Sequence, residues 1–159
     1  MKHAVVIPLT HSPETALRAL VQPLFHLDKW RRMGALGCEL IDDGAEGEIR
    51  LRRRARQGAA PAPLSKLVPS EVTFLNLDRW NPARKTGEVE VKLDGLPLRM
   101  HATTKVVPTA QGCELRFDWD IQASVPLLGG AMEKFVAKNV DRETLEEAKV
   151  VNALLATYA

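Results

Sequence analysis

The clearest pattern in the chain is an alternation of hydrophobic and polar residues in its second half. Between residues 114 and 122 nearly every odd-numbered position is hydrophobic and every even-numbered one is polar or charged. The same period of two recurs over residues 88–93 and 98–107, and it is typical of strands with one buried and one exposed face. The pattern predicts an antiparallel sheet that is covered on one side only. Seven strands are expected in all, at residues 3–9, 36–41, 48–55, 72–80, 88–93, 98–107 and 114–122.

Helical periodicity marks the beginning and the end of the chain. Ser12, Pro13 and Glu14 have the residue types of an N-cap and a first helical turn, so a helix is expected to begin there. A second short helical piece is expected over residues 27–33. The last element, residues 131–157, predicts a long amphipathic helix. One side of it is hydrophobic, formed by Met132, Val136, Val140, Ala148, Val151, Leu155 and Tyr158.

Two connections between the expected strands differ in kind. Residues 42–47 are rich in Asp and Gly and predict a hairpin turn. Residues 58–70 contain three prolines and predict a longer loop or crossover.

The dimensions of these elements predict a curved sheet. Seven strands at about 4.8 Å spacing span roughly 29 Å, whereas a helix is only about 10–12 Å wide. A flat sheet would leave a large apolar patch uncovered, so the sheet is expected to curl around the long helix. Strand parity and helical spacing point five aromatic rings into the enclosed space. These rings, Phe74, Trp80, Phe117, Trp119 and Phe135, either line a cavity or close a solid core.

Composition and charge exclude several classes of protein. With 45% hydrophobic and 26% charged residues, the chain has enough apolar material to fold, which excludes an intrinsically disordered protein. Its net charge of +2 gives no reason to expect nucleic acid as a partner. No apolar run approaches the length of a membrane span, and the first residues are read as a strand rather than a signal peptide. We therefore expect a cytoplasmic protein without stable membrane insertion.

Three motifs carry a resemblance to a known superfamily. They are Asp78-Arg79-Trp80, Gly95-Leu96-Pro97 and, most specific, the run VPLLGGAMEK at residues 125–134. With the order of elements, they resemble the START-like (SRPBCC, helix-grip) superfamily, to which the birch pollen allergen belongs, and within it a bacterial family of unassigned function. The resemblance implies an α+β fold, a single domain over residues 1–159. Its curved seven-stranded antiparallel sheet would wrap around a long C-terminal helix, with two short helices after the first strand.

The resemblance also implies a deep apolar pocket between the sheet and the C-terminal helix. Members of the superfamily bind or transport lipids, sterols, quinones and polyketides, and a minority are enzymes. Eleven residues are expected to contact a ligand in such a pocket: Phe74, Trp80, Met100, Phe117, Trp119, Leu128, Met132, Phe135, Val136, Glu147 and Arg53.

Glu147 is the most informative polar residue among them. Helical spacing puts it inside the apolar arc, where a carboxylate needs a partner or a shifted pKa. Arg53 shares strand parity with Ile49 and Leu51, so it is expected to point inward and to be a possible partner for Glu147. In the alternative, Glu147 lies at the solvated rim of the helix. The other arginines of residues 50–56 are expected mostly on the outer, solvated face of the sheet.

These observations predict a protein that binds, sequesters or transports a hydrophobic small molecule, lipid-like, isoprenoid or polyketide-like. Two alternatives remain open: a polyketide-cyclase-like enzyme that uses a pocket acid, and a protein-interaction module with a filled core. No cofactor is predicted, and the four histidines have no metal-binding spacing, so neither a metal site nor catalytic residues are assigned. The sequence leaves the oligomeric state open.

Overall fold

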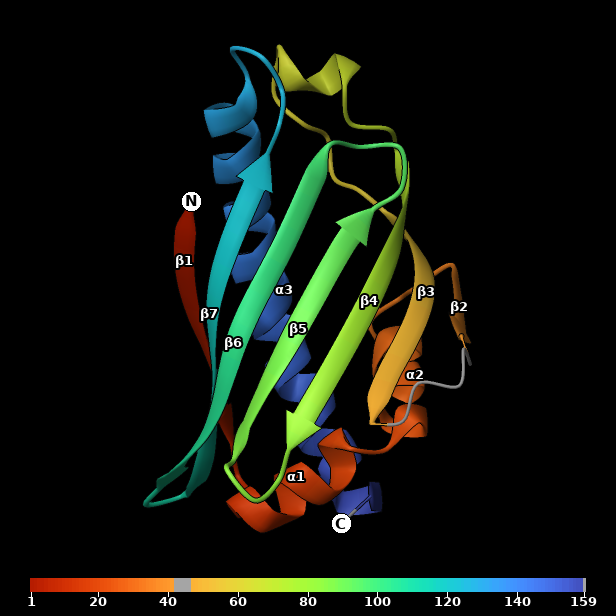
Figure 1. Cartoon of the computed structure of the whole chain (residues 1–159). Helices are drawn as coiled ribbons and strands as arrows, with labels where there is room; N and C mark the ends of the chain where they lie inside the picture. The colour runs from red at the N-terminus through yellow and green to blue at the C-terminus, as the bar shows by residue number, and fades with distance from the viewer. Residues whose placement is uncertain (42–46, 159) are drawn as a thin grey trace.

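A computed structural model describes residues 1–41 and 47–158 of the chain. Within them, seven strands form one antiparallel sheet in the order β1-β7-β6-β5-β4-β3-β2 (Figure 1). The predicted sheet is thus confirmed, while the hairpin turn predicted at residues 42–47 lies almost entirely outside the described residues. The strands are β1 (Lys2–Leu9), β2 (Gly37–Leu40), β3 (Glu48–Arg56), β4 (Glu71–Asn81), β5 (Thr86–Leu93), β6 (Leu98–Thr109) and β7 (Gly112–Ala123).

Two short helices follow β1, as expected. Helix α1 (Pro13–Leu20) begins where the capping residues predict, and the Ser12 hydroxyl accepts a hydrogen bond from the backbone N–H of Thr15 at 3.2 Å. Helix α2 (Pro23–Arg32) begins four residues before the predicted start at residue 27. Pro23 occupies its first turn, where the missing N–H of proline does no harm. The loop at residues 58–70 contains one short 3-10 helix, η1 (Leu64–Lys66).

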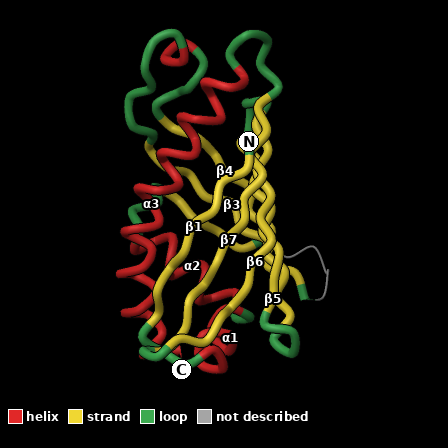
Figure 2. Tube along the Cα trace, turned by 90° about the vertical axis from the view of Figure 1, so that its left-hand side faces the viewer, coloured by secondary structure: helices red, strands yellow, loops and turns green. Residues whose placement is uncertain are grey.

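The long C-terminal helix α3 (Gly129–Tyr158) lies along the inner face of the curved sheet, and Figure 2 shows all the helices on that side. Polar contacts hold both α3 and its neighbours in place. The side chain of Asn152 accepts a hydrogen bond from the Thr10 backbone N–H at 2.9 Å and donates one to the Pro8 carbonyl at 3.0 Å. Near the C-terminus, the Tyr158 hydroxyl donates to the Asp28 carboxylate on α2.

Burial along α3 is uneven. Met132 and Ala137 near its start are buried, as are Val151, Leu154 and Leu155 near its end. Between Ala137 and Val151 no residue is fully buried. Because this middle stretch still faces the sheet, the two layers are packed tightly only at the ends of the helix. No helix in the described part of the chain is long and apolar enough to cross a membrane.

Candidate functional site

A cavity of about 110 Å³ separates the middle of α3 from the inner face of the sheet. Ten of the eleven residues expected to contact a ligand line it: Phe74, Trp80, Met100, Phe117, Trp119, Met132, Phe135, Val136, Glu147 and Arg53. Leu128 is not among the lining residues. It precedes the first residue of α3, so helical spacing does not apply to it, and it packs half-buried against the core.

Most of the cavity wall is apolar. Phe117 and Trp119 stand on the same face of β7, because they are two residues apart on one strand. Their rings are stacked with centroids 5.9 Å apart and an interplanar angle of 5°. Met132 and Phe135 face the cavity from the beginning of α3. Such a wall removes apolar ligand surface from water, which is the main source of affinity in hydrophobic pockets.

Trp80 lines the cavity near the end of β4. The position of its indole ring depends on the small size of Gly87 beside it. A Cβ at Gly87 would lie 2.6 Å from Cε3 of Trp80 and 2.7 Å from Oγ1 of Thr104. Any larger residue at position 87 would therefore displace the indole ring. In the described part of the chain, Trp80 Nε1 and Thr104 Oγ1 are the two fully buried side-chain polar atoms without a hydrogen-bond partner.

The cavity is polar toward this same end, because the inward-facing positions of β4 just before Trp80 are Asn76 and Asp78 rather than apolar residues. Opposite Asp78 lies His26 of α2, whose Nε2 donates to the Leu20 carbonyl at 2.7 Å, while Nδ1 lies 3.6 Å from an Asp78 oxygen. Burial lowers the pKa of His26, and the negative charge of Asp78 only partly opposes this shift. The imidazole is therefore held neutral.

Glu147 forms an ion pair with Lys29, and not with its possible partner Arg53. The Lys29 Nζ lies 2.7 Å from Glu147 Oε1, and both side chains are almost fully enclosed, 9% and 14% exposed. The possible Glu147–Arg53 ion pair is therefore not formed, although both side chains line the cavity. The reason is geometric, because α2 packs against α3 and places Lys29 within ion-pair distance of Glu147.

Arg53 makes contacts of a different kind. Its Nε donates to Asn76 Oδ1 at 3.2 Å. The guanidinium carbon lies 3.7 Å from the centroid of the Trp30 ring and 4.0 Å from that of Phe74, so the cation is stabilised by aromatic rings. Burial lowers the pKa of Arg53, and the negative charge of Glu143 is the largest effect that opposes this shift. Arginine remains charged despite such a shift.

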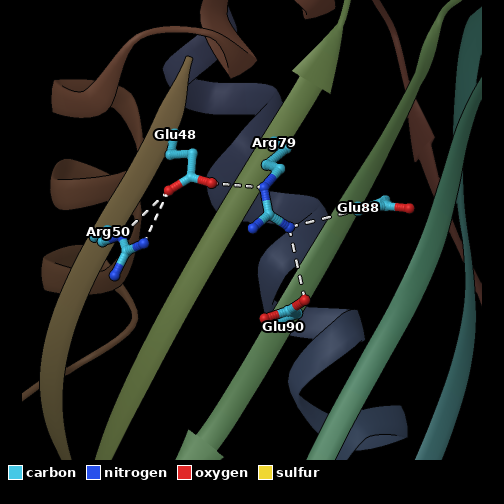
Figure 3. A network of polar contacts seen from close by, with 5 residues as sticks. All are labelled: Glu48, Arg50, Arg79, Glu88 and Glu90. Atoms are coloured by element: carbon cyan, nitrogen blue, oxygen red, sulfur yellow. Dashed lines mark hydrogen bonds and ion pairs between the residues drawn. The ribbon is translucent and has the colours of Figure 1, made fainter. Parts of the chain in front are cut away.

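On the outer face of the same strands, the polar side chains form a surface network (Figure 3). Arg79 donates to Glu48 from Nε at 2.8 Å, and Arg50 contacts the second oxygen of Glu48 at 3.0 Å. The other end of Arg79 lies 3.8 Å from Glu88 and 3.6 Å from Glu90. These hydrogen bonds lower the pKa of Glu48, with the contribution of Arg79 the largest.

A family model described as "Protein of unknown function (DUF2505)" matches residues 4–155 of the chain. The chain belongs to this family. No curated protein is detectably similar to it in sequence.

Solved structures share the fold of this DUF2505 member at low sequence identity. The protein TTHA0849 from Thermus thermophilus is 14% identical with a TM-score of 0.69, over 100% of this chain and 99% of that one. The Zhui aromatase/cyclase from a Streptomyces species is 12% identical with a TM-score of 0.65, over 98% and 92%. A norcoclaurine synthase mutant from Thalictrum flavum, solved with a transition state analogue, is 15% identical with a TM-score of 0.63, over 99% and 94%. The START-like, helix-grip fold is thereby confirmed.

Four ionisable residues of the cavity wall were missed at the level of sequence: His26, Lys29, Asp78 and Glu143. A signal existed for Glu143, because it lies one helical turn before Glu147 and must share its face of α3. No comparable signal existed for His26 and Lys29. Among the described residues, no group of three or more His, Cys, Asp or Glu side chains is placed to hold a metal ion.

Proposed function

We propose that this DUF2505 member binds a hydrophobic small molecule, lipid-like, isoprenoid or polyketide-like, between its sheet and α3. In this proposal the whole chain acts as one START-like domain built around the binding site. The observation that carries it is the cavity itself, which is walled by apolar side chains and polar at one end only. Such a wall with a few placed polar groups is typical of small-molecule sites.

The volume of the cavity limits the size of the ligand portion that it encloses. One water-sized atom needs about 10–15 Å³ of such space. The cavity of about 110 Å³ is several times larger than this requirement, so it has room for part of a small molecule. A ligand larger than this space would extend beyond the cavity or displace the half-buried middle of α3.

Ligand uptake tests the proposal. Native mass spectrometry, with solvent extraction of the purified protein, would detect a co-purified molecule, and titration with fatty acids, sterols and quinones would detect uptake. Val136→Trp fills the cavity from α3 and should reduce uptake at least about tenfold, because it displaces ligand volume. Leu145→Trp is the matched control on the same helix, since Leu145 is 71% exposed, and it should bind as the wild type does. A protein that ignores the whole panel, or two variants that behave alike, would refute the proposal.

Proton transfer on a bound ligand is a second candidate function, favoured by the position of the Glu143 carboxyl on the cavity wall. Burial raises the pKa of Glu143, and the negative charge of Glu147 adds to the shift, which is the condition of a general acid or base. A cyclase-like reaction would therefore use Glu143, since Glu147 is neutralised by Lys29. Incubation with a linear poly-β-ketone substrate analogue, followed by mass spectrometry of the products, should show turnover by the wild type and none by Glu143→Gln. An interaction module with a filled core is not supported by the cavity.

A further inference from the structure

The polar end of the cavity borders a second hollow on the surface. This outer hollow, of about 450 Å³, lies between the end of α2, residues 34–36, β3 and α3. Trp30, Arg53 and Glu143 line both the cavity and the outer hollow. These three side chains are therefore the boundary between the interior and the surface.

Two opposite charges at this boundary, Arg53 and Glu143, attract each other without a direct contact. Within residues 1–41 and 47–158, Arg53 forms no ion pair, and its one hydrogen bond, to Asn76, uses Nε. Glu143 likewise has neither an ion pair nor a hydrogen bond from its side chain in that part of the chain. Other charged groups nearby have contacts of their own, because Lys29 holds Glu147 and the guanidinium of Arg142 donates to Asn139 at 2.7 Å.

The unused atoms of Arg53 and Glu143 open onto space. Among the described residues, only Trp80 Nε1 and Thr104 Oγ1 are fully enclosed side-chain polar atoms without a partner. The terminal nitrogens of Arg53 and the carboxyl oxygens of Glu143 are therefore accessible from the hollows that they line. A buried charge without a partner is strongly unfavourable in a packed interior, so an open position beside both charges is a place for a ligand group.

The surrounding charges select the kind of group that fits there. A carboxylate on a ligand would be attracted by Arg53 but repelled by Glu147, Asp78 and ionised Glu143. An ammonium group would be attracted by Glu143 and Asp78 but repelled by Arg53 and Lys29. A hydroxyl avoids both penalties, since its oxygen accepts from Arg53 while its hydrogen is donated to Glu143.

We propose that Arg53 and Glu143 hold the hydroxyl group of an uncharged amphipathic ligand, an alcohol or a phenol, whose hydrophobic body fills the cavity. The inference rests on the proposed function and narrows its ligand class. Hydrogen bonds to charged groups are the stronger ones in proteins. The hydroxyl should therefore add a measurable preference to the non-specific affinity of the apolar wall.

Three probes with the same hydrocarbon chain isolate the contribution of the polar group: decanol, decanoate and decane. Binding to the full-length protein would be measured by calorimetry or by displacement of a fluorescent apolar dye. For the wild type we expect decanol to bind about tenfold more tightly than decane, with decanoate weaker than decanol. Arg53→Met should weaken decanol binding about tenfold and so remove the preference for decanol over decane.

Matched variants separate recognition from folding. Arg54→Met removes an arginine from the exposed outer side of the same strand and should leave the affinity for all three probes unchanged. Glu143→Gln keeps an acceptor for the hydroxyl and should retain most of the decanol affinity. Arg53→Lys keeps the positive charge but loses hydrogen-bond donors. Its affinity for decanol should therefore lie between those of the wild type and Arg53→Met. Melting temperatures of all variants, measured without probe, report whether each one is folded.

The outcomes distinguish this inference from the proposed function. Equal binding of decanol and decane, or an unchanged preference in Arg53→Met, would overturn the hydroxyl site and leave the hydrophobic pocket intact. A preference for decanoate that depends on Arg53 would also overturn it, in favour of a carboxylate ligand. If no probe binds at all, and the wider panel fails as well, the proposed function itself is refuted.

Discussion

The strands β3 and β4 carry arginines and carboxylates on both faces, but the arginines form ion pairs on one face only. On the outer face, Arg79 and Arg50 both contact Glu48 directly, and each arginine side chain is 40% exposed (Figure 3). On the inner face, Arg53 is 5% exposed, and no carboxylate of the described residues forms an ion pair with it. Exposed charges are thus paired, whereas the most enclosed arginine is not.

This difference reflects the cost of removing a charge from water. Outside, water already solvates each group, so an ion pair forms easily and adds little stability. Inside, desolvation is costly, and a hydrophobic residue in place of Arg53 would pack more favourably. A buried arginine that is held by aromatic rings and an amide, at the edge of a cavity, is typical of a binding site rather than of a stabilising contact.

The largest effect is expected from Lys29→Met, which breaks the enclosed pair on the inner face. Glu147 would remain 14% exposed without its cation, so the free energy of unfolding should fall by about 3 kcal/mol. The double variant Lys29→Met with Glu147→Met should recover most of the loss, because no unpaired charge is left. Urea denaturation measures both, with the exposed Lys149→Met as control. A loss as small as in the control would show that water reaches the pair freely.

A smaller, pH-dependent effect is expected from Glu143→Gln. Burial raises the pKa of Glu143 in the folded state above its ordinary value of 4.5. The protonated carboxyl is therefore tolerated below pH 4.5, and stability is lost as the pH rises through the raised pKa. The variant lacks this loss, so it should become more stable than the wild type by about 1 kcal/mol toward neutral pH. Denaturation at a series of pH values measures the stability difference between the variant and the wild type. A difference that is the same at every pH would contradict the prediction.

The inner face shows how far the sequence alone could predict such a site. Strand parity correctly placed Phe117, Trp119 and Arg53 toward the helix, and helical spacing placed Glu147 there, because these patterns depend only on the local period of the backbone. The partner of Glu147 was not predictable in this way. Lys29 meets it across 118 residues, through packing of α2 against α3, and no local period encodes that contact.

The cavity could not be predicted from local sequence patterns, for the same reason. The alternation predicts which side chains point inward, but the same inward rings either line a space or fill it. The outcome depends on how closely the middle of α3 approaches the sheet. That distance is set at its two ends, by Met132 on one side and by Val151 and Leu155 on the other.

The smallest effect is expected from Arg79→Met on the outer face, and it completes the comparison with Lys29→Met. Arg79 contacts three carboxylates, more than Lys29 does, so a count of contacts would rank its loss as the more damaging. Exposure predicts the opposite, because solvent screens each of these pairs. The melting temperature should fall by about 2 °C or less, and salt at about 0.5 M should remove the difference. Calorimetry at low and high salt measures this. A loss equal to that of Lys29→Met, unaffected by salt, would show that contacts rather than desolvation govern the charges of this sheet.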